Sequence, residues 1–102
     1  MTQSKHLLGL CLDLIGQRIT LEDVAILAHL ANVAESTDYA GIATACRINP
    51  MTLRRYVKSL RDRGFIQRVE IGTDRRFVGL AITTEGREFL ATICRALSSC
   101  HE

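Results

Sequence analysis

The hydrophobic residues of this chain follow two different periods, and the change between them divides the sequence. Over most of the chain they recur at intervals of three and four, the spacing that places them on one face of an α-helix. Between residues 65 and 82 they alternate with polar residues, as expected of β-strands. The pattern therefore predicts a mainly α-helical, α+β fold of five helices, with a small β-hairpin after the fourth.

The most clearly bounded helix runs between Asn49 and Gly64. Asparagine is a favoured N-cap, and Pro50 fits the first helical position because no backbone donor is needed there. Gly64 can adopt the left-handed conformation that closes a helix. One face is apolar at helical spacing, and it consists of Leu53, Tyr56, Val57 and Leu60.

The remaining faces of this helix are basic and polar. Arginine and lysine can pair with phosphates or guanine edges in a DNA major groove, and threonine can pair with either. A solvated basic face is the common alternative meaning of such a charge run. The residues concerned are Met51, Thr52, Arg54, Arg55, Lys58, Ser59, Arg61 and Asp62.

Four further helices are predicted where helical apolar spacing follows a capping residue. The third helix and the basic helix are separated by about three residues, the arrangement of a helix-turn-helix. Residues 17–19 are expected to be a link, and residues 35–37 a short extended segment. The expected helices and caps are residues 4–16 with Ser4, 21–33 with Thr20, 39–46 with Asp38, and a last helix capped by Thr83 or Thr84.

Two strands, residues 65–71 and 77–82, are predicted on either side of a turn at residues 72–76. Arg75 and Arg76 lie at or just beyond the tip of this turn. Such a hairpin can place an arginine against a neighbouring minor groove or the DNA backbone, since narrow grooves attract arginine. An ordinary exposed hairpin tip is the alternative, but a basic helix followed at once by a basic hairpin favours nucleic-acid binding.

The charge distribution points the same way. The net charge of the chain is only +2, yet residues 47–76 hold nine Lys or Arg against three Asp or Glu, a net charge of +6. The rest of the chain holds four against eight, a net charge of −4. Positive charge gathered in one segment is typical of a protein that binds a polyanion.

The first and last helices carry more apolar surface than one small domain can bury. Residues 20–83 can form a core of their own from Val24, Leu27, Ile42, Leu53, Val57, Leu60, Ile66 and Leu80. We therefore expect a single domain in which residues 1–19 and 84–102 supply dimerisation helices. The residues expected in the dimer contact are Leu7, Leu8, Cys11, Leu14, Ile15, Phe89, Leu90, Ile93 and Leu97.

Several other classes of function find no support in the sequence. No nucleophile arrangement, phosphate loop or paired-carboxylate pattern is visible, so neither an enzyme nor a cofactor is expected. The four cysteines form no C-x-x-C motif and His29 has no spaced partner, so no metal site is expected. We expect buried reduced cysteines, with redox sensing as the alternative. No long apolar run or signal-peptide pattern occurs, and a cytoplasmic location is expected.

From about Thr20 to Leu90 the chain resembles the winged helix-turn-helix core of the MarR family of bacterial transcription regulators. Three pieces carry the resemblance in the right order and spacing. They are the run from I-A-T-A-C-R to R-G-F-I at residues 42–66, the D-R-R at residues 74–76, and I-T-T-E-G-R-E-F-L at residues 82–90.

The resemblance implies a site and an assembly. The start of the basic helix would enter the major groove, the wing arginine would be Arg76, and Asp74 would shape the turn. MarR-family proteins are homodimers joined through helices from both chain ends, which here would be residues 5–16 and 85–100. The major-groove residues implied are Asn49, Met51, Thr52, Arg54 and Arg55.

The chain departs from the family in its length and its C-terminal end. Only one helix follows the wing where the family generally has two, so the dimer contact and the pocket for a small-molecule effector are in question. We expect a homodimeric, sequence-specific transcription regulator, a repressor that reads an inverted repeat of double-stranded DNA. A plasmid or phage protein for DNA segregation or replication control, and a winged helix used for protein interaction, stay open as alternatives.

Overall fold

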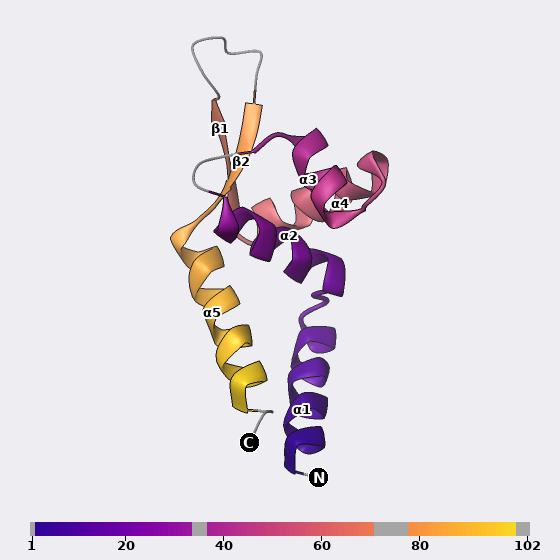
Figure 1. Ribbon diagram of the computed structural model, residues 1–102, viewed down its shortest axis with the longest axis vertical. Helices are drawn as coiled ribbons and strands as arrows, with labels where there is room; N and C mark the ends of the chain where they lie inside the picture. Colours follow the sequence, from indigo (N-terminus) through magenta and orange to yellow (C-terminus); the bar gives the residue numbers. More distant parts are fainter. Residues whose placement is uncertain (1, 34–36, 71–77, 100–102) are drawn as a thin grey trace.

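The computed structural model describes residues 2–33, 37–70 and 78–99 of the chain. It contains the helices and the hairpin that the sequence predicts, in the predicted order (Figure 1). The elements are α1 (Thr2–Gly16), α2 (Leu21–Asn32), α3 (Tyr39–Cys46), α4 (Pro50–Asp62), β1 (Ile66–Glu70), β2 (Val78–Ile82) and α5 (Thr84–Ser99). The fold is thus a winged helix-turn-helix extended by a helix at each end.

The helix starts follow the predicted capping residues, with one exception. Thr20 and Asp23 form a reciprocal capping box, and the Asp38 side chain accepts from the backbone N–H of Gly41 at 2.8 Å. Of the two candidates for α5, Thr83 is the cap, because its hydroxyl accepts from Gly86 N–H at 3.0 Å. Ser4 does not cap α1, since the helix already begins at Thr2.

The sheet is an antiparallel pair in which Ile66 lies opposite Ile82 and Glu70 opposite Val78. Thr37 extends it by one residue, because its N–H and C=O both bond to Leu80, at 3.2 and 2.7 Å. Thr37 is the last residue of the extended segment expected at residues 35–37, and residues 35 and 36 lie outside the described residues. The first strand begins at Ile66, one residue later than predicted, and the second ends at Ile82 as predicted. Residues 71–77, which include the predicted turn at residues 72–76, lie outside the described residues.

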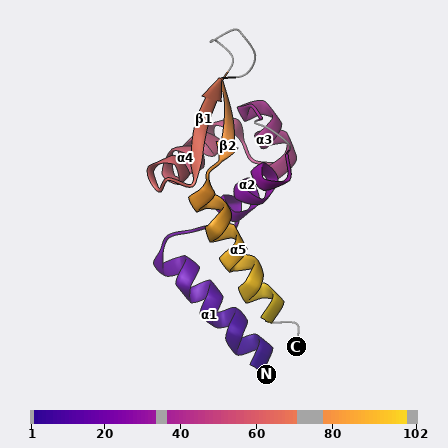
Figure 2. The ribbon, with the colours of Figure 1, turned by 90° about the vertical axis from the view of Figure 1, so that its left-hand side faces the viewer.

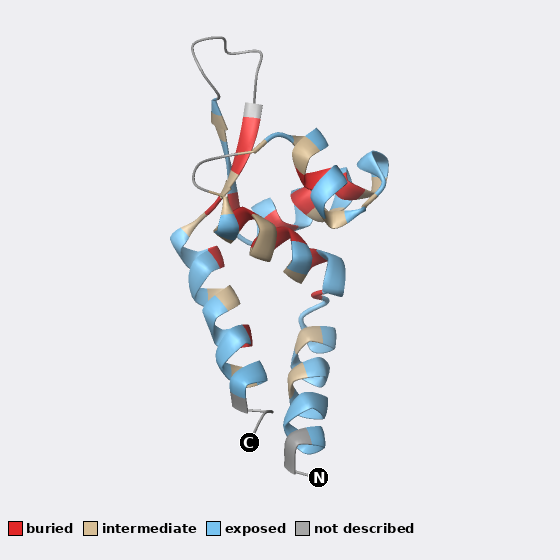
Figure 3. Cartoon of the chain, viewed as in Figure 1, coloured by how far each residue is buried: buried red, intermediate tan, exposed pale blue. Residues whose placement is uncertain are grey.

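The core lies where α2, α3 and α4 meet the inner face of the sheet (Figure 3). Seven of the eight predicted core residues are buried there, but Val24 is only half-buried. The face of α2 that enters the core carries Ile26, Leu27 and Leu30 instead, which form a stripe at spacings of one, three and four. Val24 lies beside this stripe rather than within it.

The terminal helices α1 and α5 run side by side away from the core, with the start of α1 and the end of α5 farthest from it (Figures 1 and 2). They account for much of the elongated shape, which measures 53 × 25 × 22 Å. Within the described residues no helix combines the length and the apolar character needed to cross a membrane.

The start of α5 is joined firmly to the core. The Thr83 hydroxyl donates to the Gly64 carbonyl at 2.6 Å, and the Phe65 and Phe89 rings stack with centroids 4.6 Å apart. Gly86 is buried, and a Cβ built on it would lie 2.2 Å from the Phe65 carbonyl oxygen. Only a glycine therefore allows α5 to pass this close to the chain that enters β1.

Candidate nucleic-acid interface

The backbone around α4 fixes where this helix begins. Arg47 ends α3 in the left-handed conformation, with φ 57°, and its N–H bonds to the Ala43 carbonyl. The Asn49 side chain then accepts from Met51 N–H at 2.9 Å, with Pro50 in the first helical position. The predicted cap is confirmed, and the turn between α3 and α4 is as tight as the sequence indicated.

Burial divides α4 into the two faces that the sequence predicts. Leu53, Val57 and Leu60 are buried in the core, and Tyr56 is half-buried. Gly64 closes the C-terminal end with φ 81°, and the Phe65 N–H returns to the Leu60 carbonyl at 3.0 Å. The opposite face is therefore held toward solvent by packing on one side and by a defined cap at each end.

The exposed face carries most of the predicted site residues. Arg55 and Lys58 are exposed, and Met51 is 80% exposed although it is apolar. Asn49 is exposed as well, while Thr52 is half-buried. An unburied methionine beside basic side chains suits a surface that is covered when a partner binds, because apolar groups can contact the methyl group of thymine.

Arg54 has a second role that the sequence did not indicate. Its guanidinium carbon lies 5.6 Å from the centroid of the Tyr39 ring, within the range of a cation–π contact. Tyr39 is the first residue of α3, so this contact joins the two helices of the helix-turn-helix. Arg54 therefore contributes to the packing of α3 on α4 as well as to the positive charge of the surface.

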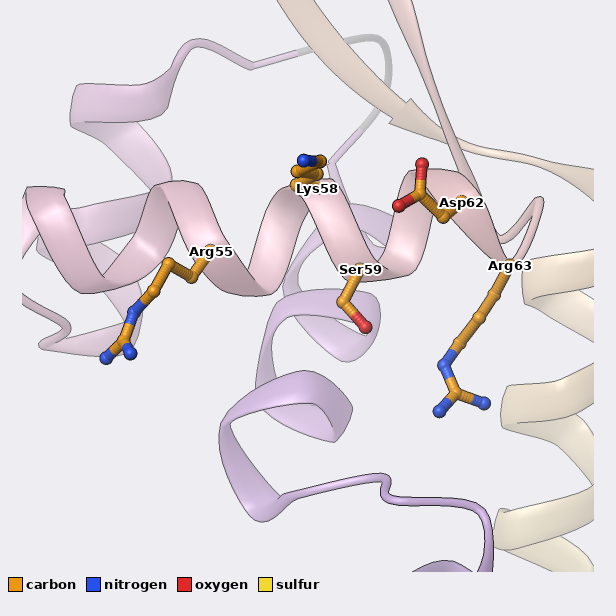
Figure 4. A pocket seen from close by; sticks show the side chains of 5 residues that line it. All are labelled: Arg55, Lys58, Ser59, Asp62 and Arg63. Carbon is orange, nitrogen blue, oxygen red and sulfur yellow. The ribbon is translucent and has the colours of Figure 1, made fainter.

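A surface hollow of about 420 Å³ lies along the C-terminal half of α4. Its lining includes three cations and one carboxylate, so its charge is positive. Figure 4 shows Arg63 extending beyond the end of the helix, on the side where the segment between α1 and α2 passes. The lining residues are Arg55, Lys58, Ser59, Asp62 and Arg63. Arg63 is missing from the predicted site, although it continues the spacing of four that runs from Arg55 through Ser59, and this spacing is the signal that could have identified it.

The predicted wing contact is not part of the described structure. Arg75 and Arg76 lie outside the described residues, and their role stays a prediction. The paired strands that carry this turn extend away from α5 and past the core (Figure 1).

The predicted dimer residues divide into three groups by burial. Leu7, Leu8, Cys11, Ile15 and Leu97 are exposed, and Leu14, Phe89 and Leu90 are half-buried. Ile93 is buried within its own chain, and Phe89 stacks on Phe65. Both side chains pack against their own chain, because α5 turns one face toward it. A hollow of about 370 Å³ lies beside the exposed group, lined by Cys11, Leu14, Ile15, Ile19, Thr20 and Leu21.

The cysteines differ in their surroundings. Cys11 and Cys94 are exposed on the terminal helices, whereas Cys46 is half-buried at the end of α3. Burial raises the pKa of the Cys46 thiol. The expectation of buried cysteines thus holds in part for Cys46 and is wrong for Cys11 and Cys94, which lie on the outer surface of a single chain.

The structure is similar to those of known transcription regulators, although neither a protein-family profile nor a curated protein sequence matches the chain. A variant of MepR from S. aureus has a TM-score of 0.81 at 20% identity, covering 99% of this chain and 74% of that one. YusO from Bacillus subtilis has a TM-score of 0.80 at 21% identity, covering 94% of this chain and 67% of that one. A MarR-family regulator from a Rhodococcus species has a TM-score of 0.74 at 20% identity, covering 96% of this chain and 70% of that one.

These likenesses extend over nearly the whole chain. They show that it has the MarR-like winged helix-turn-helix fold, with α1 and α5 included as well as the core. The resemblance found in the sequence is thereby confirmed at the level of the fold. Another variant of MepR has been solved bound to an oligodeoxyribonucleotide, with a TM-score of 0.74 at 22% identity, covering 97% of this chain and 70% of that one.

Proposed function

We propose that this protein is a homodimeric, sequence-specific DNA-binding transcription regulator that reads an inverted repeat through α4 and represses by occupying a promoter. The observation that carries this proposal is the exposed basic face of α4 on a MarR-like fold. Arg55 and Lys58 project from a helix whose opposite side is buried and whose start is capped. Such a helix can enter a major groove and pair with base edges without a conformational change, because its basic face is already exposed.

Several further observations support binding to DNA rather than to another polyanion. The half-buried Thr52 and the exposed Met51 lie in the first turn of α4, where the docking geometry of this motif brings side chains closest to base edges. The fold is shared with MepR, which has been solved with an oligodeoxyribonucleotide. The predicted wing arginine, Arg76, would add a contact to the backbone or the minor groove.

The homodimer is proposed from the apolar surface of α1. Leu8, Leu12 and Ile15 are 58%, 57% and 67% exposed in the single chain, together with the neighbouring Leu7. A two-fold contact through α1 and α5 would bury both copies of this surface and direct two α4 helices toward one side of a duplex. Half-sites about one helical turn apart, ~34 Å, would then match an inverted repeat.

The test is selection of duplexes from a random pool by the full chain, followed by footprinting and a binding titration on the selected duplex. We expect one protected inverted repeat, bound by a dimer. Arg55→Ala should weaken binding to it by about 1–3 kcal/mol. Arg87→Ala, which removes an exposed arginine from α5, is the matched control and should bind as wild type does.

Other outcomes would identify the alternatives. Protection of a tandem array, with cooperative filling along the DNA, would replace the repressor with a segregation or replication-control protein. No selected sequence and no affinity for random duplex at low salt would overturn DNA binding itself. The winged helix would then be a protein-interaction module.

A further inference from the structure

The end of α4 and the end of α1 meet at one hydrogen bond. The Arg63 guanidinium donates to the backbone carbonyl oxygen of Gln17, a residue 46 positions away in the sequence. Gln17 belongs to the short link between α1 and α2, and Arg63 directly follows α4. The contact therefore joins a terminal helix proposed for dimerisation to the helix proposed to read DNA.

Both ends of this contact have a defined backbone geometry. In the link, Ile19 N–H bonds to the Leu14 carbonyl at 2.8 Å while Arg18 takes the left-handed conformation, with φ 60°. After α4, Phe65 N–H bonds to the Leu60 carbonyl at 3.0 Å around Gly64. Both helices therefore end with the same type of hydrogen bond, from a backbone N–H to the carbonyl five residues earlier. The direction of the Gln17 carbonyl and the starting point of the Arg63 side chain are thus both fixed.

The contact also closes a ring of packed elements. Helix α1 packs along α5, and the start of α5 is joined to the end of α4 through the Thr83 hydroxyl and the Phe65–Phe89 stack. Arg63 supplies a second connection, from the end of α4 directly to the exit of α1. Without it, the exit of α1 would be held to the core through the buried Ile19 and through α5.

We propose that Arg63 is a positioning residue that sets the angle between α1 and α4, and with it the separation of the two α4 helices in the dimer. This inference rests on the proposed function. A small rotation at the link is magnified along an elongated molecule 53 Å in length. The loss of Arg63 should therefore matter for a duplex whose two half-sites must be occupied together.

A direct phosphate contact is the competing role for Arg63, because its side chain also lines the basic hollow on α4. The two roles differ in their dependence on salt and on the DNA sequence. A lost phosphate contact weakens binding to specific and random duplexes alike. It also lowers the salt slope, the slope of log affinity against log salt concentration, by about one unit for each contact. A lost positioning contact weakens only binding that requires both half-sites, and it leaves the salt slope unchanged.

The experiment compares Arg63→Ala, Arg63→Lys and Arg61→Ala in the full-length dimer. Arg61→Ala removes the same charge two residues away, from an exposed side chain that does not line the hollow. The probes are the duplex selected by wild type, the same duplex with its half-sites moved apart by one and two base pairs, and a random duplex. Amide hydrogen exchange at residues 17–19 without DNA is the readout that needs no operator.

Arg63→Ala should lose about three- to tenfold in affinity for the selected duplex, because fewer molecules hold the binding-competent angle. The affinity that Arg63→Ala loses when the half-sites are moved apart should be smaller than the affinity that wild type loses. Amide hydrogen exchange at residues 17–19 should become several-fold faster. Arg63→Lys should recover part of both, since an ammonium group can donate to one carbonyl. Arg61→Ala, which removes a charge from the same basic helix, should leave both the spacing preference and the exchange at residues 17–19 as in wild type.

Two results would overturn the inference, and a third would refute only the proposed function. Equal weakening on selected and random duplexes with a lower salt slope would make Arg63 a phosphate contact. Exchange and spacing preference identical to wild type would show that the contact to Gln17 positions nothing. A wild-type chain that selects no duplex would refute the proposed function, whereas the exchange result would still decide whether Arg63 holds the link.

Discussion

The apolar residues of α1 and those of α4 have the same helical spacing but opposite surroundings. In α4, Leu53 and Leu60 are fully buried against the rest of the chain. In α1, Leu8 and Leu12 are more than half exposed. A leucine contributes stability only when some surface covers it, and the core residues cover one another within a single subunit. Leu8 and Leu12 have much less cover within one chain, so the two regions should respond differently to mutation.

The largest effect is expected in the core. Leu27 is fully buried in α2, and Leu27→Ala should lower the free energy of unfolding by about 2–5 kcal/mol, from lost burial and the cavity left behind. Leu21→Ala is the matched control, because Leu21 is 82% exposed on the same helix and should change the unfolding free energy little. Urea denaturation measures both. Equal destabilisation by the two variants would contradict the assignment of the core.

The next effect should appear in assembly rather than in the fold of one subunit. We expect the double variant Leu8→Glu, Leu12→Glu to be monomeric at micromolar concentration, where we expect wild type to be a dimer. Burying the exposed parts of two leucines contributes roughly 1.5–3 kcal/mol per subunit, and glutamate would also have to lose its hydration. Light scattering gives the mass of each species. Glu22→Gln on α2 controls for an unrelated exposed change, and a double variant that stays dimeric would remove α1 from the interface.

A somewhat smaller effect is expected where the two regions join. Gly86→Ala would place a methyl group against the Phe65 carbonyl, so either α5 or the start of β1 must shift. Such overpacking typically costs about 1–3 kcal/mol in the free energy of unfolding. Gly9→Ala has open space around the new methyl group and serves as the control in thermal melts. A Gly86→Ala protein as stable as wild type would mean that α5 is less tightly held than the structure shows.

The smallest effect separates two neighbouring arginines on the basic helix. Arg54→Ala should lower stability by about 0.5–1 kcal/mol, because it removes the cation–π contact with Tyr39 at an exposed site. Arg55→Ala removes an exposed arginine from the same helix and should melt as wild type does. Tyr39→Leu should reproduce the Arg54→Ala loss, and adding Arg54→Ala to it should cost little more. Additive losses in this double-mutant cycle would show that the two side chains do not interact.

The sequence determined the elements and most of their ends. Caps such as Asn49, Asp38 and Thr20 act within one helical turn, so local sequence is enough to identify them. The buried face of α4 followed from apolar spacing alone, and the motifs around it indicated the MarR-like fold. The alternation of apolar residues likewise predicted the antiparallel strand pair, with the start of the first strand one residue too early.

The tertiary structure decided what depends on neighbours distant in the sequence. Spacing could not show that Ile26 would be buried in the core while Val24 stayed half-buried. It also could not show that Arg54 would lie over Tyr39 or that Arg63 would reach Gln17. Nor could it show that α5 would turn Ile93 inward while Leu97 stayed exposed. A helical pattern identifies an apolar face but not the surface that covers it, because that surface exists only once the whole chain has packed.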